Sequence, residues 1–137
     1  MSSSNILALD VGEVRVGVAR ANNIARIAEP LSTLEVSETI YDDIKSLVEQ
    51  HDCAVVVVGL PRNMRGEETA QSVRIRAFVG ELKQALAVPI VFQDESLTSV
   101  KAEQSLQQRK TGYNKGDVDA LAAVYILEDY LATSESK

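Results

Sequence analysis

Three acidic positions in the sequence could supply ligands for a metal-dependent hydrolase, and the first of them is Asp10. Asp10 follows the apolar stretch Ile6–Leu9, and the alternation of a strand places it on the same face as Ile6 and Ala8. An ionised carboxylate against an apolar core is costly unless it is hydrogen-bonded, paired or bound to a metal. Asp10 could instead accept hydrogen bonds from the amides of a turn near Gly12. Considered alone, Asp10 fits either role.

The second position is the acidic pair Asp94 and Glu95, which follows the predicted strand Pro89–Gln93. In an open α/β sheet, ligands bind beyond the carboxyl ends of the strands, where this pair should lie. Two neighbouring carboxylates repel each other at neutral pH, so we expect a cation or a hydrogen-bond donor close by. The alternative is that one acid caps a helix beginning near Ser99 while the other is solvated.

The third position is Asp119, near the start of the predicted helix Val118–Leu131. An acid there interacts favourably with the helix dipole, which is enough to explain either Asp119 or its neighbour Asp117. However, Asp119 shares a helical face with Ala123 and Ile126. Because a small alanine lets that face approach a sheet closely, we expect Asp119 to point over the strand ends and Asp117 to cap the helix.

Acids from three separate elements at one edge of a sheet predict a metal site. Oxygen ligands suit Mg²⁺ or Mn²⁺, and the single histidine and the single cysteine are not placed to help. With two such ions, one can activate water while the other stabilises the leaving oxygen during in-line attack on phosphorus. The predicted chemistry is hydrolysis of a phosphodiester.

Several basic and polar residues are candidates for contacts with nucleic acid. The predicted loop Gly59–Gly66 leads from a buried strand into a helix, a junction that can present amides to a phosphate. Its arginines could hold phosphate bidentately, and its asparagine could contact sugar or base. The loop lacks the ending of a Walker motif, and surface-loop arginines often have no such function. Lys115 is the stronger candidate because it precedes Asp119 closely. The candidate set is Arg15, Arg62, Asn63, Arg65 and Lys115.

The elements that must position these residues alternate between strands and helices. The pattern predicts strands at Asn5–Leu9, Arg15–Ala19, Leu31–Leu34, Cys53–Val58 and Pro89–Gln93. It predicts helices at Thr39–Gln50 with Ser37 as cap, at about Glu68–Ala87, at Ser99–Gln107 and at Val118–Leu131, with a polar loop at Gln108–Gly116. A tight turn joins the first two strands, where Gly12 can supply a positive φ. The short early connections predict an antiparallel meander of three strands, and the later alternation predicts parallel pairing. The expected fold is α/β, with a mixed sheet and helices on both faces.

Length and composition fit one domain over residues 1–137, with flexible tails at about 1–4 and 133–137. No apolar run approaches the roughly 20 residues that span a bilayer, so no membrane segment is expected. The N-terminus lacks the basic segment and long apolar stretch of a secretory signal. The single cysteine, Cys53, excludes an internal disulfide and fits a reducing compartment. We therefore expect a cytoplasmic protein.

The net charge of −6 is unusual for a protein that binds nucleic acid. Residues 29–52 hold seven acidic residues and one lysine, which accounts for all of it. The remainder is neutral and includes four arginines within residues 62–76 and four basic residues within 101–115. Because only a local patch need face phosphate, the overall acidity does not exclude such a substrate. Ordinary solvated charge is the alternative.

Taken in order, several motifs resemble the YqgF family, bacterial proteins similar to RuvC resolvases and built on the RNase H-like fold. The matching segments are Ala8–Gly12, Arg15–Ala19, Val58–Pro61, Asn63–Met64, Gly66, Phe92–Glu95, Leu97–Ser99, Lys115–Gly116 and Val118–Ala120. The resemblance covers nearly the whole chain. It implies a five-stranded mixed sheet and a metal-dependent nuclease that acts on structured nucleic acid. It also implies that Asp10, Glu95 and Asp119 are the catalytic metal ligands.

The resemblance implies two substrates, the precursor of 16S ribosomal RNA, trimmed at its 5′ end during ribosome biogenesis, and four-way DNA junctions. We expect the ribosomal RNA precursor. Two positions depart from the family pattern: Ser96 replaces an arginine that usually follows the Asp-Glu pair, and Val14 replaces a residue that is frequently polar or basic. Both changes remove charge near the expected site and should weaken substrate binding or activity.

Two other functions compete with a nuclease. A strand followed by Asp-Val-Gly also resembles the phosphate loop of actin-like ATPases and sugar kinases, but those enzymes need two domains around a cleft. The fold could also serve as a binding module that contacts RNA or ribosomal proteins without cutting, which the net acidity and Ser96 favour. The sequence marks no interface, so it leaves the oligomeric state open.

Overall fold

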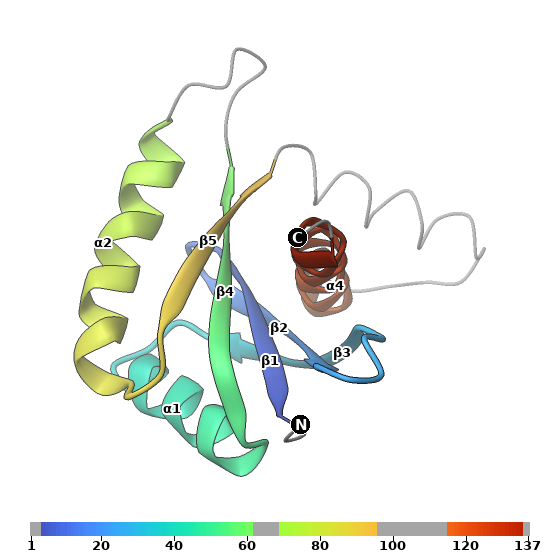
Figure 1. The fold of residues 1–137 in the computed structure, drawn as a ribbon. Helices are drawn as coiled ribbons and strands as arrows, with labels where there is room; N and C mark the ends of the chain where they lie inside the picture. The colour runs from blue at the N-terminus through green and yellow to red at the C-terminus, as the bar shows by residue number, and fades with distance from the viewer. Residues whose placement is uncertain (1–3, 62–68, 96–114, 136–137) are drawn as a thin grey trace.

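The computed structural model describes residues 4–61, 69–95 and 115–135, which form a five-stranded sheet with helices against both faces (Figure 1). Its elements, in chain order, are β1 (Asn5–Val11), β2 (Arg15–Asn22), β3 (Glu29–Glu35), α1 (Ile40–Gln50), β4 (Cys53–Pro61), α2 (Ala70–Ala85), β5 (Ile90–Glu95) and α4 (Lys115–Glu135). None of the described helices is both long and apolar enough to cross a membrane.

The strands lie in the order β3-β2-β1-β4-β5. Strands β1, β2 and β3 pair antiparallel, whereas β1 with β4 and β4 with β5 pair parallel. This confirms the predicted mixed sheet with an antiparallel meander at its start. The carboxyl ends of β1, β4 and β5 therefore meet at the same edge, the arrangement that places ligand sites in open α/β sheets.

Two apolar cores lie on opposite faces of the sheet. On β1, Leu7 and Leu9 pack with α1 and α2, while Ile6 and Ala8 pack with α4. Figure 1 shows the same division, with α1 and α2 on one side of the sheet and α4 on the other. The α4 side is rich in alanine, so this helix can approach the sheet closely. Residues of β1 on the Ile6 and Ala8 side therefore lie under α4.

Strands β4 and β5 are longer than the sequence pattern predicts. The expected loop Gly59–Gly66 begins only after Pro61, because Leu60 is buried and extends the ladder with β5. Asp94 and Glu95 do not follow β5 but are its last two residues, paired with Leu60 and Pro61. The pair thus reaches the expected edge of the sheet as part of the strand.

Helix α4 is also longer than predicted at both ends. It begins at Lys115, so Lys115 and Gly116 are helical rather than part of a loop, and Asp117 lies within the first turn instead of capping it. It continues to Glu135, so residues 133–135 are helical rather than a flexible tail. The helix thus includes Gly116, although glycine has a low intrinsic helix propensity.

Two local predictions are wrong. The residue that caps α1 is Thr39, not Ser37, and it makes no capping hydrogen bond with its side chain. Gly12 does not adopt a positive φ. Its amide donates to the carbonyl oxygen of Arg15 at 2.9 Å, and a Cβ on Gly12 would lie 2.7 Å from that oxygen. A glycine is required there because the backbone of Arg15 approaches so closely across the turn, and not because φ is positive. The helix expected at 99–107 lies outside the described residues.

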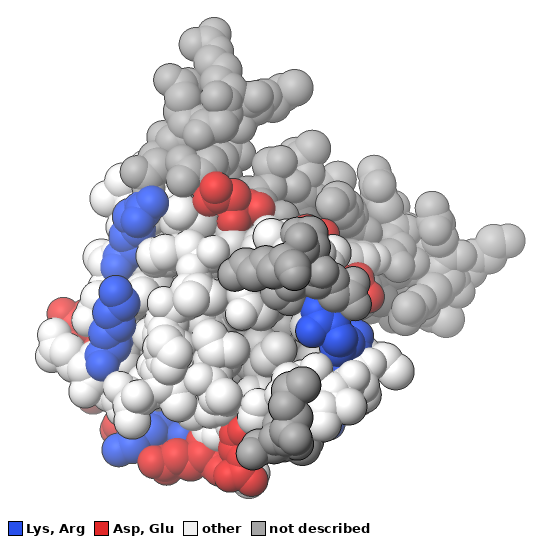
Figure 2. All heavy atoms as spheres, viewed as in Figure 1, with Lys and Arg blue, Asp and Glu red and all other residues white. Residues whose placement is uncertain are grey.

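Charged side chains separate on the surface as their distribution along the chain predicts. Figure 2 shows lysine and arginine side chains along the edge formed by α2, and aspartate and glutamate side chains at the end of the molecule where α1 lies. The acidic residues of α1 thus lie away from the carboxyl-terminal edge of the sheet, whereas Glu35, at the end of β3, pairs with Arg15 at that edge.

Candidate active site

Asp10 lies near the end of β1, on the side of the sheet that α4 covers. It continues the alternation that places Ile6 and Ala8 against this helix. The amide of Gly12 is occupied by the carbonyl oxygen of Arg15, so Asp10 does not accept from that turn amide. The role of Asp10 as a turn-stabilising residue is therefore not supported.

Gly17 brings Asp119 to Asp10. In the β1–β2 ladder, Gly17 is the direct partner of Asp10. A Cβ on Gly17 would lie 1.9 Å from the backbone oxygen of Asp119 and 2.8 Å from the backbone nitrogen of Ala120. The start of α4 therefore rests on the strand with no side chain between them, and Asp119 lies next to the position of Asp10.

The environment of Asp10 disfavours its charged form. Desolvation, and to a smaller extent the neighbouring negative charge of Asp119, raise the pKa of the Asp10 carboxyl to about 6. Among the described residues, no donor is hydrogen-bonded to this carboxylate. A desolvated carboxylate beside a second carboxylate is an arrangement that a cation would stabilise.

Asp119 has an ion pair with Arg15, the first residue of β2. The Nε of Arg15 donates to Oδ2 of Asp119 at 2.8 Å. The side chains are partly accessible, with relative exposures of 30% for Arg15 and 24% for Asp119. Arg15 is therefore in direct contact with one of the two carboxylates and close enough to solvent to meet a substrate.

The other predicted site residues are located only by their backbone or not at all. Glu95 is the last residue of β5 and pairs with Pro61 of β4. Its position is on the same face of the strand as Val91, which packs against the core under α4. Lys115 begins α4, one turn before Asp119. The side chains of Glu95 and Lys115 lie outside the described part of the structure, as do Arg62, Asn63 and Arg65 entirely.

The site therefore has two carboxylates that the structure brings together. Among the described side chains, no group of three or more histidine, cysteine, aspartate or glutamate residues could hold a metal ion. Asp10 and Asp119 by themselves offer oxygen ligands, the chemistry that Mg²⁺ or Mn²⁺ prefers. The third predicted ligand, Glu95, belongs to a strand that ends at the same edge of the sheet.

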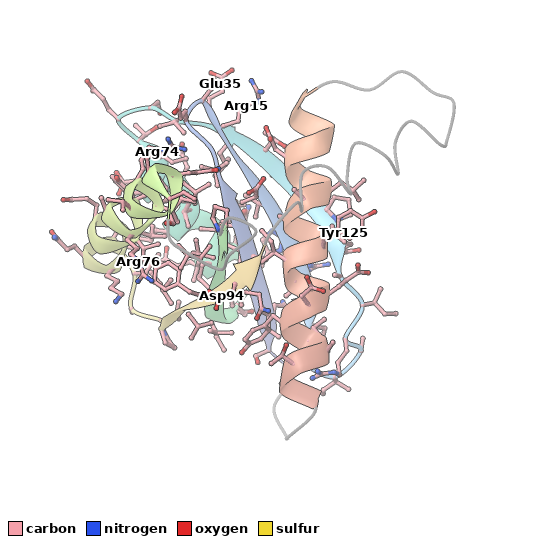
Figure 3. The ribbon with its side chains drawn as sticks, turned by 90° about the horizontal axis from the view of Figure 1, so that it is seen from above. Arg15, Glu35, Arg74, Arg76, Asp94 and Tyr125 are labelled. Carbon is pink, nitrogen blue, oxygen red and sulfur yellow. The ribbon has the colours of Figure 1, made fainter. Side chains whose placement is uncertain are left out.

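A pocket of about 440 Å³ opens beside Asp119. It lies between the turn after β1, the first turns of α2 and the start of α4, and Asp119 and Arg15 form part of its wall. The pocket also contains a second ion pair, in which Nη1 of Arg74 donates to Oε1 of Glu13 at 2.8 Å. Figure 3 shows Arg15 beside Glu35 at the top of the view and Arg74 at the upper left on α2, with Arg76 and Asp94 nearer the middle.

The sequence did not identify Arg74, Glu13 or Gln71 as site residues. The one available signal was the four arginines within residues 62–76, of which Arg74 is one. Glu13 and Arg74 are 61 positions apart, so their contact depends on how α2 returns beside the turn after β1. Neither residue has a motif that would mark it locally.

Comparison with known proteins provides a family match and curated relatives. A family model described as "RuvX: Holliday junction resolvase" matches residues 4–133. A protein of Chloroflexus aurantiacus named "Putative pre-16S rRNA nuclease" is 44% identical over 140 residues, covering 99% of this chain and 92% of the relative. A protein of Thermoanaerobacter pseudethanolicus with the same name is 35% identical over 137 residues, covering 96% and 99% of the two chains.

Solved structures share the fold. RuvC of T. thermophilus in complex with a Holliday junction substrate superimposes with a TM-score of 0.58 at 18% identity, covering 96% of each chain. Fowlpox virus resolvase in complex with Holliday junction DNA has a TM-score of 0.55 at 10% identity, covering 95% of this chain and 98% of the resolvase. At these identities the likeness concerns the fold alone, and it confirms the RNase H-like architecture expected from the sequence.

Proposed function

The chain belongs to the RuvX family, which is the YqgF family named above for its sequence motifs, and it is a nuclease. We propose that it hydrolyses phosphodiester bonds of structured nucleic acid at the place where Asp10 and Asp119 meet. The observation that carries this proposal is the approach of Asp119 to Asp10 across Gly17. It assembles two carboxylates from distant parts of the chain at the carboxyl end of a central strand. Nothing in the packing of the sheet requires two acids at that point.

The proposed substrate is the precursor of 16S ribosomal RNA, processed at its 5′ end in the cytoplasm, with contacts to the assembling ribosome. The support is the name of relatives that are 35–44% identical over nearly the full chain. A four-way DNA junction is the second candidate, supported by the family description. The ribosomal substrate is preferred because those relatives are more similar to this chain than the RuvC structures are.

The residues present fit a divalent cation. Asp10 is a partly buried carboxylate with a raised pKa, has no hydrogen-bond donor among the described residues, and lies beside the negative charge of Asp119. In this proposal Asp10, Asp119 and Glu95 hold Mg²⁺ or Mn²⁺. Such an ion, when bound, lowers the pKa of water and stabilises charge that develops on a phosphate.

The chain's own groups have separate parts in this proposal. Asp10 must be deprotonated to act as a ligand, which its pKa of about 6 allows at neutral pH. Asp119 lies at the surface side of the site and is oriented by Arg15. Arg15 is partly exposed, is paired with Asp119 and would contact a backbone phosphate.

The test compares wild type with Asp10→Asn on end-labelled precursor 16S ribosomal RNA and on a labelled four-way junction. Each reaction is run with Mg²⁺, with Mn²⁺ and with chelator, and products are separated on denaturing gels. We expect cation-dependent cleavage of the RNA that Asp10→Asn abolishes. Asp42→Asn is the matched control, because it makes the same chemical change on an exposed position of α1 and should leave cleavage intact.

The outcomes separate the candidate functions. Cleavage of the junction but not of the RNA would assign the resolvase activity instead. Binding of RNA without cleavage under any cation would indicate a binding module. Cleavage that survives Asp10→Asn unchanged would show that the two carboxylates are not the reacting centre.

A further inference from the structure

We propose that the pocket between the turn after β1, α2 and α4 is a subsite for a backbone phosphate next to the bond being cut, and that Arg74 binds this phosphate. The proposal rests on the nuclease function proposed above. It adds a contact that the sequence motifs do not indicate, on a helix that carries none of the predicted catalytic residues. The ligand class is a phosphodiester of the bound strand, in RNA or DNA.

The first argument is position. Asp119 and Arg15 form part of the wall of the pocket, so the pocket is continuous with the site of the two carboxylates. Arg74 and Gln71 line the opposite wall from α2. A strand that reaches Asp119 with one phosphate must place a neighbouring phosphate on one side or the other, and this pocket lies on the α2 side.

The second argument is the chemistry of the lining. An arginine donates two parallel hydrogen bonds to a phosphate, and a glutamine amide can add another. The volume of about 440 Å³ is in the range of small-ligand sites, and the pocket walls contain charged and polar groups. An apolar ligand would have to desolvate four charged groups, whereas a phosphate can take the place of a carboxylate against an arginine.

The third argument is that Arg74 is held weakly. Its partner Glu13 belongs to the turn after β1, and the relative exposures are 41% for Arg74 and 73% for Glu13. An ion pair this exposed is screened by solvent and stabilises the protein little. Glu13 therefore holds Arg74 over the pocket in the free protein, and a backbone phosphate, whose two non-bridging oxygens can accept from the guanidinium as a carboxylate does, replaces Glu13 on binding.

The local structure keeps Arg74 in place for this role. Thr69 and Ser72 form a reciprocal capping box at the start of α2. The next residue after Arg74, Ile75, is buried against the sheet, which fixes the helix in rotation. The side chain of Arg76 instead lies over the ring of Phe92 in β5, with its guanidinium carbon 5.1 Å from the centre of the ring. Arg74 is thus the basic residue of α2 that lines this pocket.

The experiment measures binding by fluorescence anisotropy in the Asp10→Asn protein, which removes cleavage. The probes are a labelled precursor 16S fragment and a labelled four-way junction, titrated at several salt concentrations. Arg74→Ala should weaken binding roughly five- to tenfold at 0.1 M salt and lower the slope of log K against log salt by about 0.7 to 0.9, the loss of one phosphate contact. Lys83→Ala is the control: it removes one positive charge from the last turn of α2, away from the pocket.

A second comparison tests the exchange of partners. Glu13→Gln should tighten binding when Arg74 is present, because it releases Arg74 to bind the phosphate. The same substitution should have a smaller effect in the Arg74→Ala background, where there is no arginine to release. Equal effects of Glu13→Gln in both backgrounds would overturn the exchange, since they would show only a general gain from removing negative charge. Circular dichroism melts verify that each variant is folded.

The two proposals fail in different ways. If Arg74→Ala and Lys83→Ala weaken binding equally while wild type still cleaves, the phosphate subsite is wrong and the nuclease function stands. If wild type neither binds nor cleaves either nucleic acid, the nuclease function fails and the subsite with it.

Discussion

The backbone of Asp119 rests directly on Gly17, so closely that a Cβ on Gly17 would lie 1.9 Å from the Asp119 carbonyl oxygen. Since Gly17 is the ladder partner of Asp10, this single approach sets the spacing of the two carboxylates. The atoms that would clash belong to the backbone of a long helix, which cannot turn aside as a flexible side chain could. Gly17 is thus a positioning residue for the site, although it has no reactive group.

Gly17→Ala should therefore harm both stability and activity. The added methyl group forces α4 away from β2, which we expect to cost roughly 3 kcal/mol or more, or a fall of about 10 °C in Tm. The control is Gly80→Ala in α2, where a Cβ meets nothing within 4 Å. Gly80→Ala should stabilise the protein by about 0.5 to 1 kcal/mol through helix propensity. Thermal melts that rank the two variants alike would contradict this role of Gly17.

Asp10→Asn should make the cation-free protein more stable at neutral pH. The pKa of Asp10 is about 6 in the folded protein, against 3.8 for an unperturbed carboxyl, so the folded state binds a proton more tightly than the unfolded state. Wild type therefore loses stability as the pH rises from about 4 to 6, and the neutral amide avoids that loss. The gain is up to roughly 3 kcal/mol at pH 7.5 and should vanish by pH 4. Denaturant titrations in chelator at several pH values measure it, with Asp42→Asn as control.

Mg²⁺ or Mn²⁺ should raise the Tm of wild type at pH 8. An ion at a hundred times its Kd stabilises the folded state by about 2.7 kcal/mol. Below pH 6 protonation of Asp10 competes with the ion, so its apparent affinity should fall roughly tenfold for each pH unit. Thermal shift assays at pH 8 and pH 5 test this expectation. An equal ion-induced shift for wild type and Asp10→Asn at pH 8 would place the ion elsewhere.

Cys53 should resist alkylation in the folded protein. Its side chain is buried at the start of β4, and burial raises the pKa of the thiol to about 11. At pH 8 the reactive thiolate is then on the order of one part in a thousand. Iodoacetamide labelling followed by mass spectrometry should be slow in buffer and fast in denaturant. Fast labelling of the folded protein would mean that β4 opens locally at its first residue.

Much of this arrangement could be predicted from the sequence because it follows from local periodicity. Alternation in β1 placed Asp10 on the side of Ile6 and Ala8, and the structure shows that side against α4. Helical spacing placed Asp119 with Ala123 and Ile126, which belong to the α4 face of the sheet. The mixed sheet with an antiparallel meander at its start followed from the lengths of the connections, whereas the order of the strands was not predicted.

What could not be predicted depends on contacts between distant segments. The early start of α4 could not be expected from local propensity, because Gly116 disfavours a helix. The inclusion of Asp94 and Glu95 in β5 reflects ladder bonds to β4. The ion pair of Glu13 with Arg74 joins residues that no motif connects. The local sequence pattern thus predicted the face of β1 on which Asp10 lies and the face of α4 on which Asp119 lies. Tertiary packing determined the distance between the two carboxylates and formed the pocket beside them.

The strand that carries Asp10 lies in the middle of the sheet, paired with β2 on one side and β4 on the other. Exposing its amides to solvent requires both ladders to separate, so Leu7–Leu9 should be among the last amides to exchange with deuterium. The Asp10 carboxylate is consequently preorganised by the part of the domain that should open least. Any loss of activity in mild denaturant should therefore begin with the elements that surround β1, while Asp10 keeps its place until the sheet itself unfolds.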